Sequence, residues 1–118
     1  MNKVTLIGNL VGDPVMRSTP NGTTVATFTL AVNRKYKGSD GNKVTDYIAC
    51  VAWEQLAELV CKYMKKGSKM AINGNLQTRT WADGDGYRHY VTEVLAEEIE
   101  FLSPRTEKNY IDYDENCF

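Results

Sequence analysis

The sequence predicts an all-β domain of five strands, with one α-helix between the third and fourth strands. Two observations support this class. Apolar and polar residues alternate in five segments, which is the period of a half-buried strand. In one further segment the apolar period lengthens to that of an amphipathic helix. The chain has 118 residues, 42% of them hydrophobic, which suits one compact domain with its own core.

The first three strands are separated by residues typical of turns and loops. Proline presets φ and glycine accepts positive φ in the predicted turns, and the polar loop contains two glycines, so we expect it to be exposed and mobile. In order, the segments are a strand at Lys3–Leu10, turns at Asp13-Pro14 and Thr19–Gly22, a strand at Thr24–Arg34, a loop at Lys35–Asn42 and a strand at Lys43–Trp53. The second strand is rich in β-branched and aromatic residues, and its even-numbered apolar residues share one face, namely Ala26, Phe28, Leu30 and Val32.

The apolar period changes between Glu54 and Met64. Five apolar residues there follow helical spacing and lie on one face, namely Leu56, Leu59, Val60, Tyr63 and Met64. Lys65-Lys66-Gly67 ends this helix, because cations favour its C-terminus and glycine caps it. The remaining segments are strands at Lys69–Trp81 and Tyr87–Ala96, a hairpin turn at Asp83–Gly86 between them, and an apolar continuation at Ile99–Leu102.

Three strands, one helix and two strands match the five-stranded OB barrel, whose strand face and loops commonly bind oligonucleotides. A ferredoxin-like fold would need a second helix, and the sequence shows none. Pro104 marks the end of the predicted domain, residues 1–104. Residues 105–118 form a polar, acidic C-terminal tail, which we expect to be unstructured when free.

The formal net charge of −1 is unevenly distributed along the chain. Residues 1–92 contain twelve basic and seven acidic side chains, a net charge of +5. Residues 93–118 contain two basic and eight acidic side chains, a net charge of −6. A basic body of this kind is typical of a domain that binds nucleic acid, and the acidic end needs a separate explanation.

Aromatic rings among basic residues form the strongest candidate site. Tyr36 lies in a basic stretch, and Tyr47 and Trp53 share parity on the third strand. Trp81 shares parity with Arg79 beside the hairpin turn, where burial is difficult to arrange. Single strands are bound by such mixtures, because every base has a face to stack on and every phosphate attracts lysine or arginine.

The same residues also fit a structural role. From the pattern alone, Tyr47 and Trp53 are equally well explained as core residues, and the lysines as a solvated face. Two other aromatic residues lie on apolar faces and belong to the core, Phe28 and Tyr63. Tyr87 and Tyr90 have opposite parity, so we expect one to face inward and one outward.

Motifs for catalysis or metal binding are missing from the sequence, so we expect no enzymatic activity, metal or cofactor. The sequence places no acidic or nucleophilic neighbour beside His89, which we expect to be solvated or to be hydrogen-bonded in a structural role. Cys50, Cys61 and Cys117 are far apart and lack the spacing of a zinc site. Asp112-x-Asp114-x-Asn116 begins like a calcium loop but lacks its later ligands.

Short motifs occur in order between Asn2 and Leu102. They are Asn2-Lys3-Val4, Gly8-Asn9-Leu10, Asp13-Pro14, Pro20-Asn21-Gly22, Ala26–Val32, Leu56-Ala57-Glu58, Lys65-Lys66-Gly67-Ser68, Thr78-Arg79-Thr80-Trp81 and Val91-Thr92-Glu93-Val94. Each is short, but together they resemble the bacterial and phage single-stranded DNA-binding protein family. The resemblance implies an OB barrel that assembles into homotetramers around which DNA wraps.

The resemblance also implies which residues contact DNA. The stacking positions of the family correspond to Tyr36, Tyr47, Trp53 and Trp81. The basic contacts correspond to Lys3, Arg17, Lys43, Lys65, Lys66 and Arg79. We add Arg34 from the basic stretch around Tyr36. Two stacking positions that are often tryptophan in the family are tyrosine here, which keeps the ring but offers less surface.

The tail implies a second site. In the family, a long linker leads to an acidic tip ending in Pro-Phe, which docks DNA-processing proteins. Here the linker is nearly absent and Cys117 replaces proline, but the acidic residues and the final ring remain, at Asp112, Asp114, Glu115 and Phe118. We expect these four residues to bind replication and repair proteins.

We therefore expect a protein that binds single-stranded DNA and protects it during replication, recombination and repair. No apolar signal core or membrane-spanning run is present, so we expect a cytoplasmic, nucleoid-associated protein of bacterial or phage origin. The alternative is an OB-fold primosomal adaptor that acts mainly through protein contacts. An RNA-binding cold-shock-like protein would need aromatic motifs that the sequence lacks, and an enzyme is the weakest hypothesis.

Overall fold

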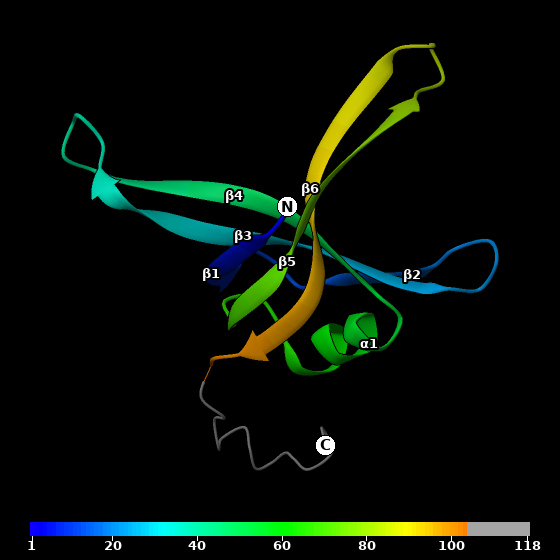
Figure 1. Ribbon diagram of the computed structural model, residues 1–118, viewed down its shortest axis with the longest axis horizontal. Helices are drawn as coiled ribbons and strands as arrows, with labels where there is room; N and C mark the ends of the chain where they lie inside the picture. Colours follow the sequence, from blue (N-terminus) through cyan, green and yellow to red (C-terminus); the bar gives the residue numbers. More distant parts are fainter. Residues whose placement is uncertain (104–118) are drawn as a thin grey trace.

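The computed structural model describes residues 1–103, which form a β-barrel from which three hairpin arms project (Figure 1). The elements are β1 (Val4–Leu10), β2 (Val15–Ser18), β3 (Thr24–Lys37), β4 (Lys43–Trp53), α1 (Glu54–Tyr63), β5 (Lys69–Ala82) and β6 (Arg88–Phe101). The predicted tail, residues 105–118, lies outside the described residues.

Five strands close the barrel. β1 pairs with β5, β5 with β6, β6 with β4 and β4 with β3, and β3 returns to β1 through the pair Leu10↔Leu30. The β4–β6 pairing is parallel, at Cys50↔Val94, and the others are antiparallel. Helix α1 connects β4 to β5 beside the barrel (Figure 1). The predicted five-stranded OB barrel with one helix is confirmed.

A sixth strand, β2, was not predicted. It occupies Val15–Ser18, between the two predicted turns, and pairs only with β3. Its four residues are all exposed, so no apolar alternation marks it as a strand. With β2 included, the helix lies between the fourth and fifth strands of the structure, β4 and β5. Among the five strands that close the barrel it follows the third, as predicted.

Two strands are longer than predicted. β3 continues to Lys37, which pairs with Lys43 after an irregular register that begins at Asn33. The prediction of a loop over Lys35–Asn42 is therefore wrong for its first three residues. β6 continues to Phe101 without a break, whereas the prediction ended a strand at Ala96.

All three arms end in the same five-residue turn. In each, the first N–H donates to the fifth carbonyl oxygen and the fourth N–H donates to the first carbonyl oxygen, over 2.8 to 3.0 Å. The turns are Thr19–Thr23, Gly38–Asn42 and Asp83–Tyr87. Their fourth residue is always glycine with a φ of 83° to 87°, a conformation that L residues rarely adopt.

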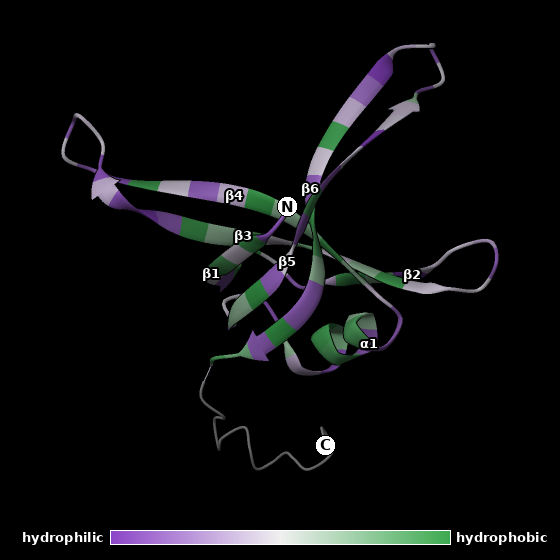
Figure 2. Ribbon diagram, viewed as in Figure 1, coloured by the Kyte–Doolittle hydropathy of each residue, from purple (hydrophilic) through white to green (hydrophobic). Residues whose placement is uncertain are grey.

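The core fills the barrel and continues under α1. Its largest fully buried side chains are Leu30, Met70, Ile72, Val60, Val94 and Cys50. The predicted apolar face of β3 is confirmed at Ala26, Phe28 and Leu30, which are buried. Tyr63 is only half-buried, and its ring lies 5.9 Å from that of Phe101 at the barrel edge. Figure 2 shows that hydrophilic and hydrophobic residues alternate along the part of β6 in the barrel, whereas the tip of its arm is hydrophilic.

The helix ends differently from the prediction. α1 stops at Tyr63, and Met64 is extended. Gly67, with a φ of 89°, forms a separate turn after the helix, and its N–H donates to the carbonyl oxygen of Leu10 over 2.8 Å. The N–H of Lys66 donates to Asp13 over 2.8 Å. The glycine therefore anchors this turn to the end of β1 and does not cap the helix directly.

Candidate nucleic-acid interface

Strand register places three of the four predicted rings on the outer surface of adjoining strands. Tyr47 and Trp53 alternate with the inward-facing residues of β4. Val51 shares their parity and pairs with Leu95 of β6, and the same parity continues across the β5–β6 ladder to Trp81. Because paired residues point to the same side of a sheet, these three rings share the outer surface.

All four predicted stacking rings are exposed. The exposed fraction is 80% for Tyr36, 67% for Tyr47, 42% for Trp53 and 48% for Trp81. The structure thus excludes the interpretation of Tyr47 and Trp53 as core residues. Tyr36 lies within the irregular register of β3, so alternation does not determine the direction of its ring. A ring of this kind can accept a base, because stacking requires an open face.

Strand β2 brings a predicted basic residue near Trp53. Arg17 pairs with Val25 of β3, and Val25 pairs with Trp53 of β4. Arg17 and Trp53 therefore lie on the same face, two strand spacings or about 10 Å apart. A base stacked on Trp53 would place its phosphate within reach of a long arginine side chain. The unpredicted strand is thus the element that positions Arg17.

Trp81 has the most closely defined surroundings of the four rings. Its indole stacks on the imidazole of His89, with ring centroids 4.3 Å apart and an interplanar angle of 17°. His89 Nε2 lies 2.8 Å from Asp83 Oδ2. The hydrogen bond from His89 holds the pKa of Asp83 below its ordinary value. This contact agrees with the expectation of a hydrogen-bonded, structural histidine, and Asp83 is the acidic neighbour that the sequence alone could not place beside it.

The turn explains why sequence reasoning missed this cluster. The prediction closed the hairpin over Asp83–Gly86, but the turn includes Tyr87 as its fifth residue. That register places His89 opposite Trp81. A glycine in the fourth position, which suits the left-handed conformation of such turns, was the available signal.

Two of the three predicted arginines, Arg34 and Arg79, already have acidic partners. Arg34 donates two hydrogen bonds to Asp46, each over 3.0 Å, and this pairing lowers the pKa of Asp46. Arg79 Nε donates to Glu93 over 3.2 Å. Both arginine side chains remain more than half exposed, so a phosphate could share them. Part of their charge is offset before any ligand binds.

The predicted lysines are exposed but lie in three separate places. Lys43 pairs with Lys37 on the β3–β4 arm. Lys3 immediately precedes β1 and lies beside β5, because its neighbour Asn2 exchanges two 2.8 Å hydrogen bonds with the backbone of Leu76. Lys65 and Lys66 lie at the other end of β1, about 20 Å away along the strand. The structure therefore does not gather the basic residues into one patch.

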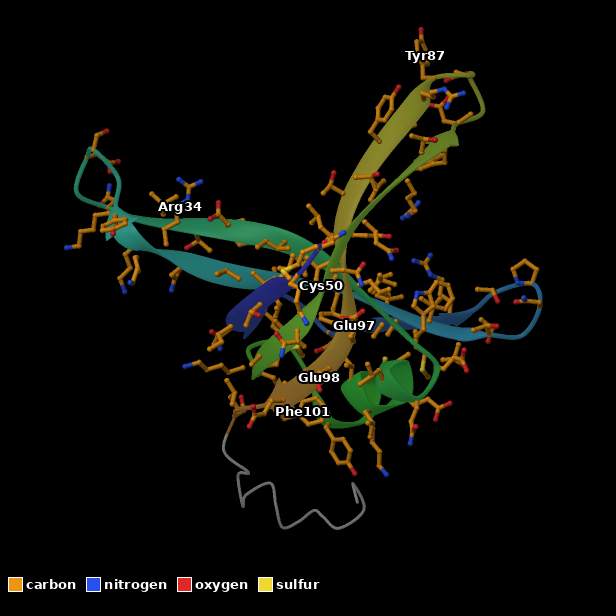
Figure 3. All side chains as sticks on the ribbon, viewed as in Figure 1. Arg34, Cys50, Tyr87, Glu97, Glu98 and Phe101 are labelled. Carbon is orange, nitrogen blue, oxygen red and sulfur yellow. The ribbon has the colours of Figure 1, made fainter. Side chains whose placement is uncertain are left out.

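The prediction for the tyrosines of the β5–β6 arm was wrong. Tyr87 and Tyr90 are both exposed, although they have opposite parity. Figure 3 shows Tyr87 at the end of the arm, far from the barrel. Because the arm has no core beneath either face here, parity does not separate buried from exposed residues.

The two cysteines in the described part of the chain are free. Cys50 lies in the centre of the barrel (Figure 3), where burial raises the pKa of its thiol to about 12. Burial also raises the pKa of Cys61, which is half-buried on α1. Among residues 1–103, no group of three histidine, cysteine or acidic residues is placed to hold a metal ion. No helix in the same range is long and apolar enough to cross a membrane.

Several known proteins are similar to this chain. Residues 1–102 match the model of the single-strand binding protein family. The chain is 54% identical to a single-stranded DNA-binding protein of Bacillus cereus over 105 residues, covering 89% of this chain and 62% of the relative. It is 51% identical to the single-stranded DNA-binding protein of Caldanaerobacter subterraneus over 106 residues, covering 90% and 71%.

A third relative, single-stranded DNA-binding protein A of Bacillus subtilis, is 49% identical over 105 residues, covering 89% of this chain and 61% of the relative. The chain thus spans less than two thirds of the length of the two Bacillus proteins. The matched region includes all four exposed rings and every basic residue of the candidate interface.

Proposed function

The chain belongs to the single-strand binding protein family, and we propose that it binds single-stranded DNA without enzymatic activity. The observation that best supports this is the outer surface shared by Tyr47, Trp53 and Trp81, whose rings are all exposed. The names of the relatives point to the same ligand.

The proposed mechanism combines stacking with backbone charge. Stacking contributes about 1–3 kcal/mol per base and is tolerant of sequence, because every base has a π-face. Lysines and arginines on the arms hold phosphates, which carry no sequence information. We therefore expect little base preference. Duplex DNA should bind far more weakly, because paired and stacked bases hide their faces.

Titration of tryptophan fluorescence with oligo-dT tests this proposal. Stacking of bases on Trp53 and Trp81 should quench the emission, with saturation at a fixed ratio of strand to protein. A duplex of the same length is the control and should leave the emission almost unchanged. An unaltered emission with oligo-dT would instead favour an OB-fold adaptor that acts through protein contacts.

We also propose that the chain assembles into homotetramers. Large apolar residues outside the candidate interface remain exposed in the single chain, among them Ile7 on β1 and Leu76 on β5. Covering such side chains is a common reason for oligomer formation. Sedimentation equilibrium should give a mass four times that of the 13.3 kDa chain. A monomer mass at micromolar concentration would contradict the assembly but not strand binding.

The proposed role in the cell is protection of exposed strands during replication, recombination and repair, in the cytoplasm of a bacterium. A protein that stacks bases without sequence preference can cover any exposed strand. Nuclease digestion of a long single strand tests this role. Saturating protein should protect the strand, and addition of competitor oligo-dT should restore its digestion.

The acidic tip is the final part of the proposal. Asp112, Asp114, Glu115 and Phe118 lie outside the described residues, and their chemistry suits a partner with an apolar pocket lined by basic residues. The tail can also compete with DNA for the basic body. Deletion of Tyr110–Phe118 should abolish binding to DNA-processing partners and slightly raise oligonucleotide affinity at low salt. Unchanged binding in both assays would exclude a role for the tip.

A further inference from the structure

Three side chains at the end of the β5–β6 arm form a connected cluster. His89 covers one face of the Trp81 indole, in a stack with centroids 4.3 Å apart. His89 also contacts Asp83 of the turn at 2.8 Å. Trp81 is about half exposed, at 48%, as expected for a ring with one covered face and one open face. The cluster lies where the barrel provides no packing for the indole.

Asp83 fixes this cluster to the backbone. One carboxylate oxygen, Oδ1, accepts hydrogen bonds from the N–H groups of Asp85 and Tyr87, over 2.9 and 3.0 Å. The other oxygen, Oδ2, faces His89. An ionised carboxylate only accepts hydrogen bonds, so Nε2 of His89 carries the proton and donates it. The turn thus holds Asp83, Asp83 holds the imidazole, and the imidazole lies flat on the indole.

The neighbouring charged side chains, Arg79 and Arg88, contact other residues than His89 and Asp83. Arg79, the next residue toward the barrel on the same face, is paired with Glu93. Arg88 contacts Thr80, which pairs with Tyr90. Thr80 and Tyr90 lie on the opposite face of the arm from Trp81 and His89. Asp83 is therefore the acidic group in contact with His89 among the described residues.

We propose that His89 is a positioning residue of the strand-binding surface, which holds the Trp81 ring so that one base stacks on its open face. This inference rests on the proposed binding of single-stranded DNA. It gives Trp81 a single stacking face and explains how a ring on a projecting arm keeps a defined direction. Without the imidazole, the indole would have to lose rotamer freedom when DNA binds.

The test uses the full chain carrying Trp53→Phe, so that Trp81 is the only tryptophan. In this background we compare His89→Ala, which removes the stack, with His89→Phe, which keeps a flat ring against the indole. Tyr90→Ala is the matched control, because Tyr90 is an exposed ring on the opposite face of the same strand. Thermal unfolding confirms that each variant is folded.

Two measurements are made on each variant. Acrylamide quenching of Trp81 fluorescence in the free protein should increase for His89→Ala, because both faces of the indole become accessible, and should stay near the parent value for His89→Phe. The affinity for oligo-dT should fall by about twofold to tenfold in His89→Ala, the range expected for the loss of one aromatic pair. His89→Phe should restore it, and Tyr90→Ala should match the parent.

Each contrary result is distinct. Unchanged quenching in His89→Ala would show that the stack does not shield Trp81, and would overturn the inference. Equal losses of affinity in His89→Ala and His89→Phe would show that the imidazole itself contacts the strand, which also overturns the positioning role. If the chain without any substitution does not bind oligo-dT, although acrylamide quenches Trp81 in the Trp53→Phe protein as expected, the proposed function is overturned, and the inference with it.

Discussion

The two halves of the β5–β6 hairpin differ in what their side chains contact. In the half that belongs to the barrel, Met70 and Ile72 of β5 and Val94 of β6 are buried. In the half that forms the arm, no residue of β5 from 77 to 82 is buried, and Trp81 lies there. One pair of strands therefore contributes to the core at one end and to the candidate interface at the other, so stability and binding should respond to different substitutions.

A β-bulge lies near the start of the arm. The register of β5 with β6 shifts between Asn73 and Gly74. Gly74 approaches the other strand so closely that a Cβ atom would lie 1.9 Å from the carbonyl oxygen of Leu95. Bulges bend a strand and increase its twist, so this one directs the arm away from the barrel. The separation of the two halves is thus built into the backbone.

The largest expected effect is on the barrel half. Ile72→Ala removes a fully buried side chain from the core and should lower the free energy of unfolding by about 2–5 kcal/mol. Urea denaturation followed by circular dichroism measures this loss. At a temperature where the variant is still folded, its affinity for oligo-dT should equal that of the parent. A comparable loss of affinity would show that the two halves are not independent.

Trp81→Ala should show the opposite behaviour. Loss of one stacking ring should weaken oligo-dT binding by about 1–3 kcal/mol, while the melting temperature stays nearly constant because the arm contributes little to the core. Trp53→Ala, at the barrel end of β4, should lower both the affinity for oligo-dT and the melting temperature. Tyr87→Ala is the control for removing an exposed ring from the arm. Unchanged affinity in both tryptophan variants would remove these rings from the interface.

The barrel interior should also respond to alkali. The folded pKa of Cys50, about 12, lies above the ordinary thiol value of 9.0, so folding favours the protonated form. This contribution is complete below pH 9 and is lost as the pH rises from 9 towards 12. Between pH 8 and pH 10 the parent should lose about 1 kcal/mol more unfolding free energy than Cys50→Ala. Equal losses would show that the thiol is not shielded.

The smallest effect concerns charge on the β3–β4 arm. The logarithm of affinity should fall linearly with the logarithm of salt concentration, with a slope of about −0.7 for each phosphate contact. Lys43→Ala should reduce the magnitude of the slope by one such contact without changing base preference. Lys62→Ala, on α1, is the control and should leave the slope unchanged. A parent slope near zero would contradict the proposed backbone contacts.

Alternation identified the strands wherever one face is buried and the other is solvated. The predicted apolar faces of the strand at Thr24–Arg34 and of the helix were correct for this reason. Where both faces are exposed, as in Val15–Ser18 and around Tyr90, the pattern contains no information on burial. The sequence thus predicted the barrel well and the arms only in outline.

The sequence could name candidate residues for the site but not their arrangement. Shared parity singled out Tyr47 and Trp53 as candidates, but the choice between core and surface needed the closed barrel. The contacts of Arg34 and of His89 depend on pairs of strands, and a turn one residue longer than expected was enough to conceal the second of them. The sequence pattern did not determine the register between paired strands, because register depends on the geometry of the turns.

The shared five-residue turn determines how such arms can change in length during evolution. Insertions inside the turn would remove its glycine from the left-handed position, so length must be added in the strands. One extra residue in each strand of the β5–β6 arm would keep the pairs aligned but rotate Trp81 and His89 to the opposite face. Two extra residues in each strand would restore the face and move the tip outward by about 7 Å. We therefore expect homologous arms to differ by multiples of four residues.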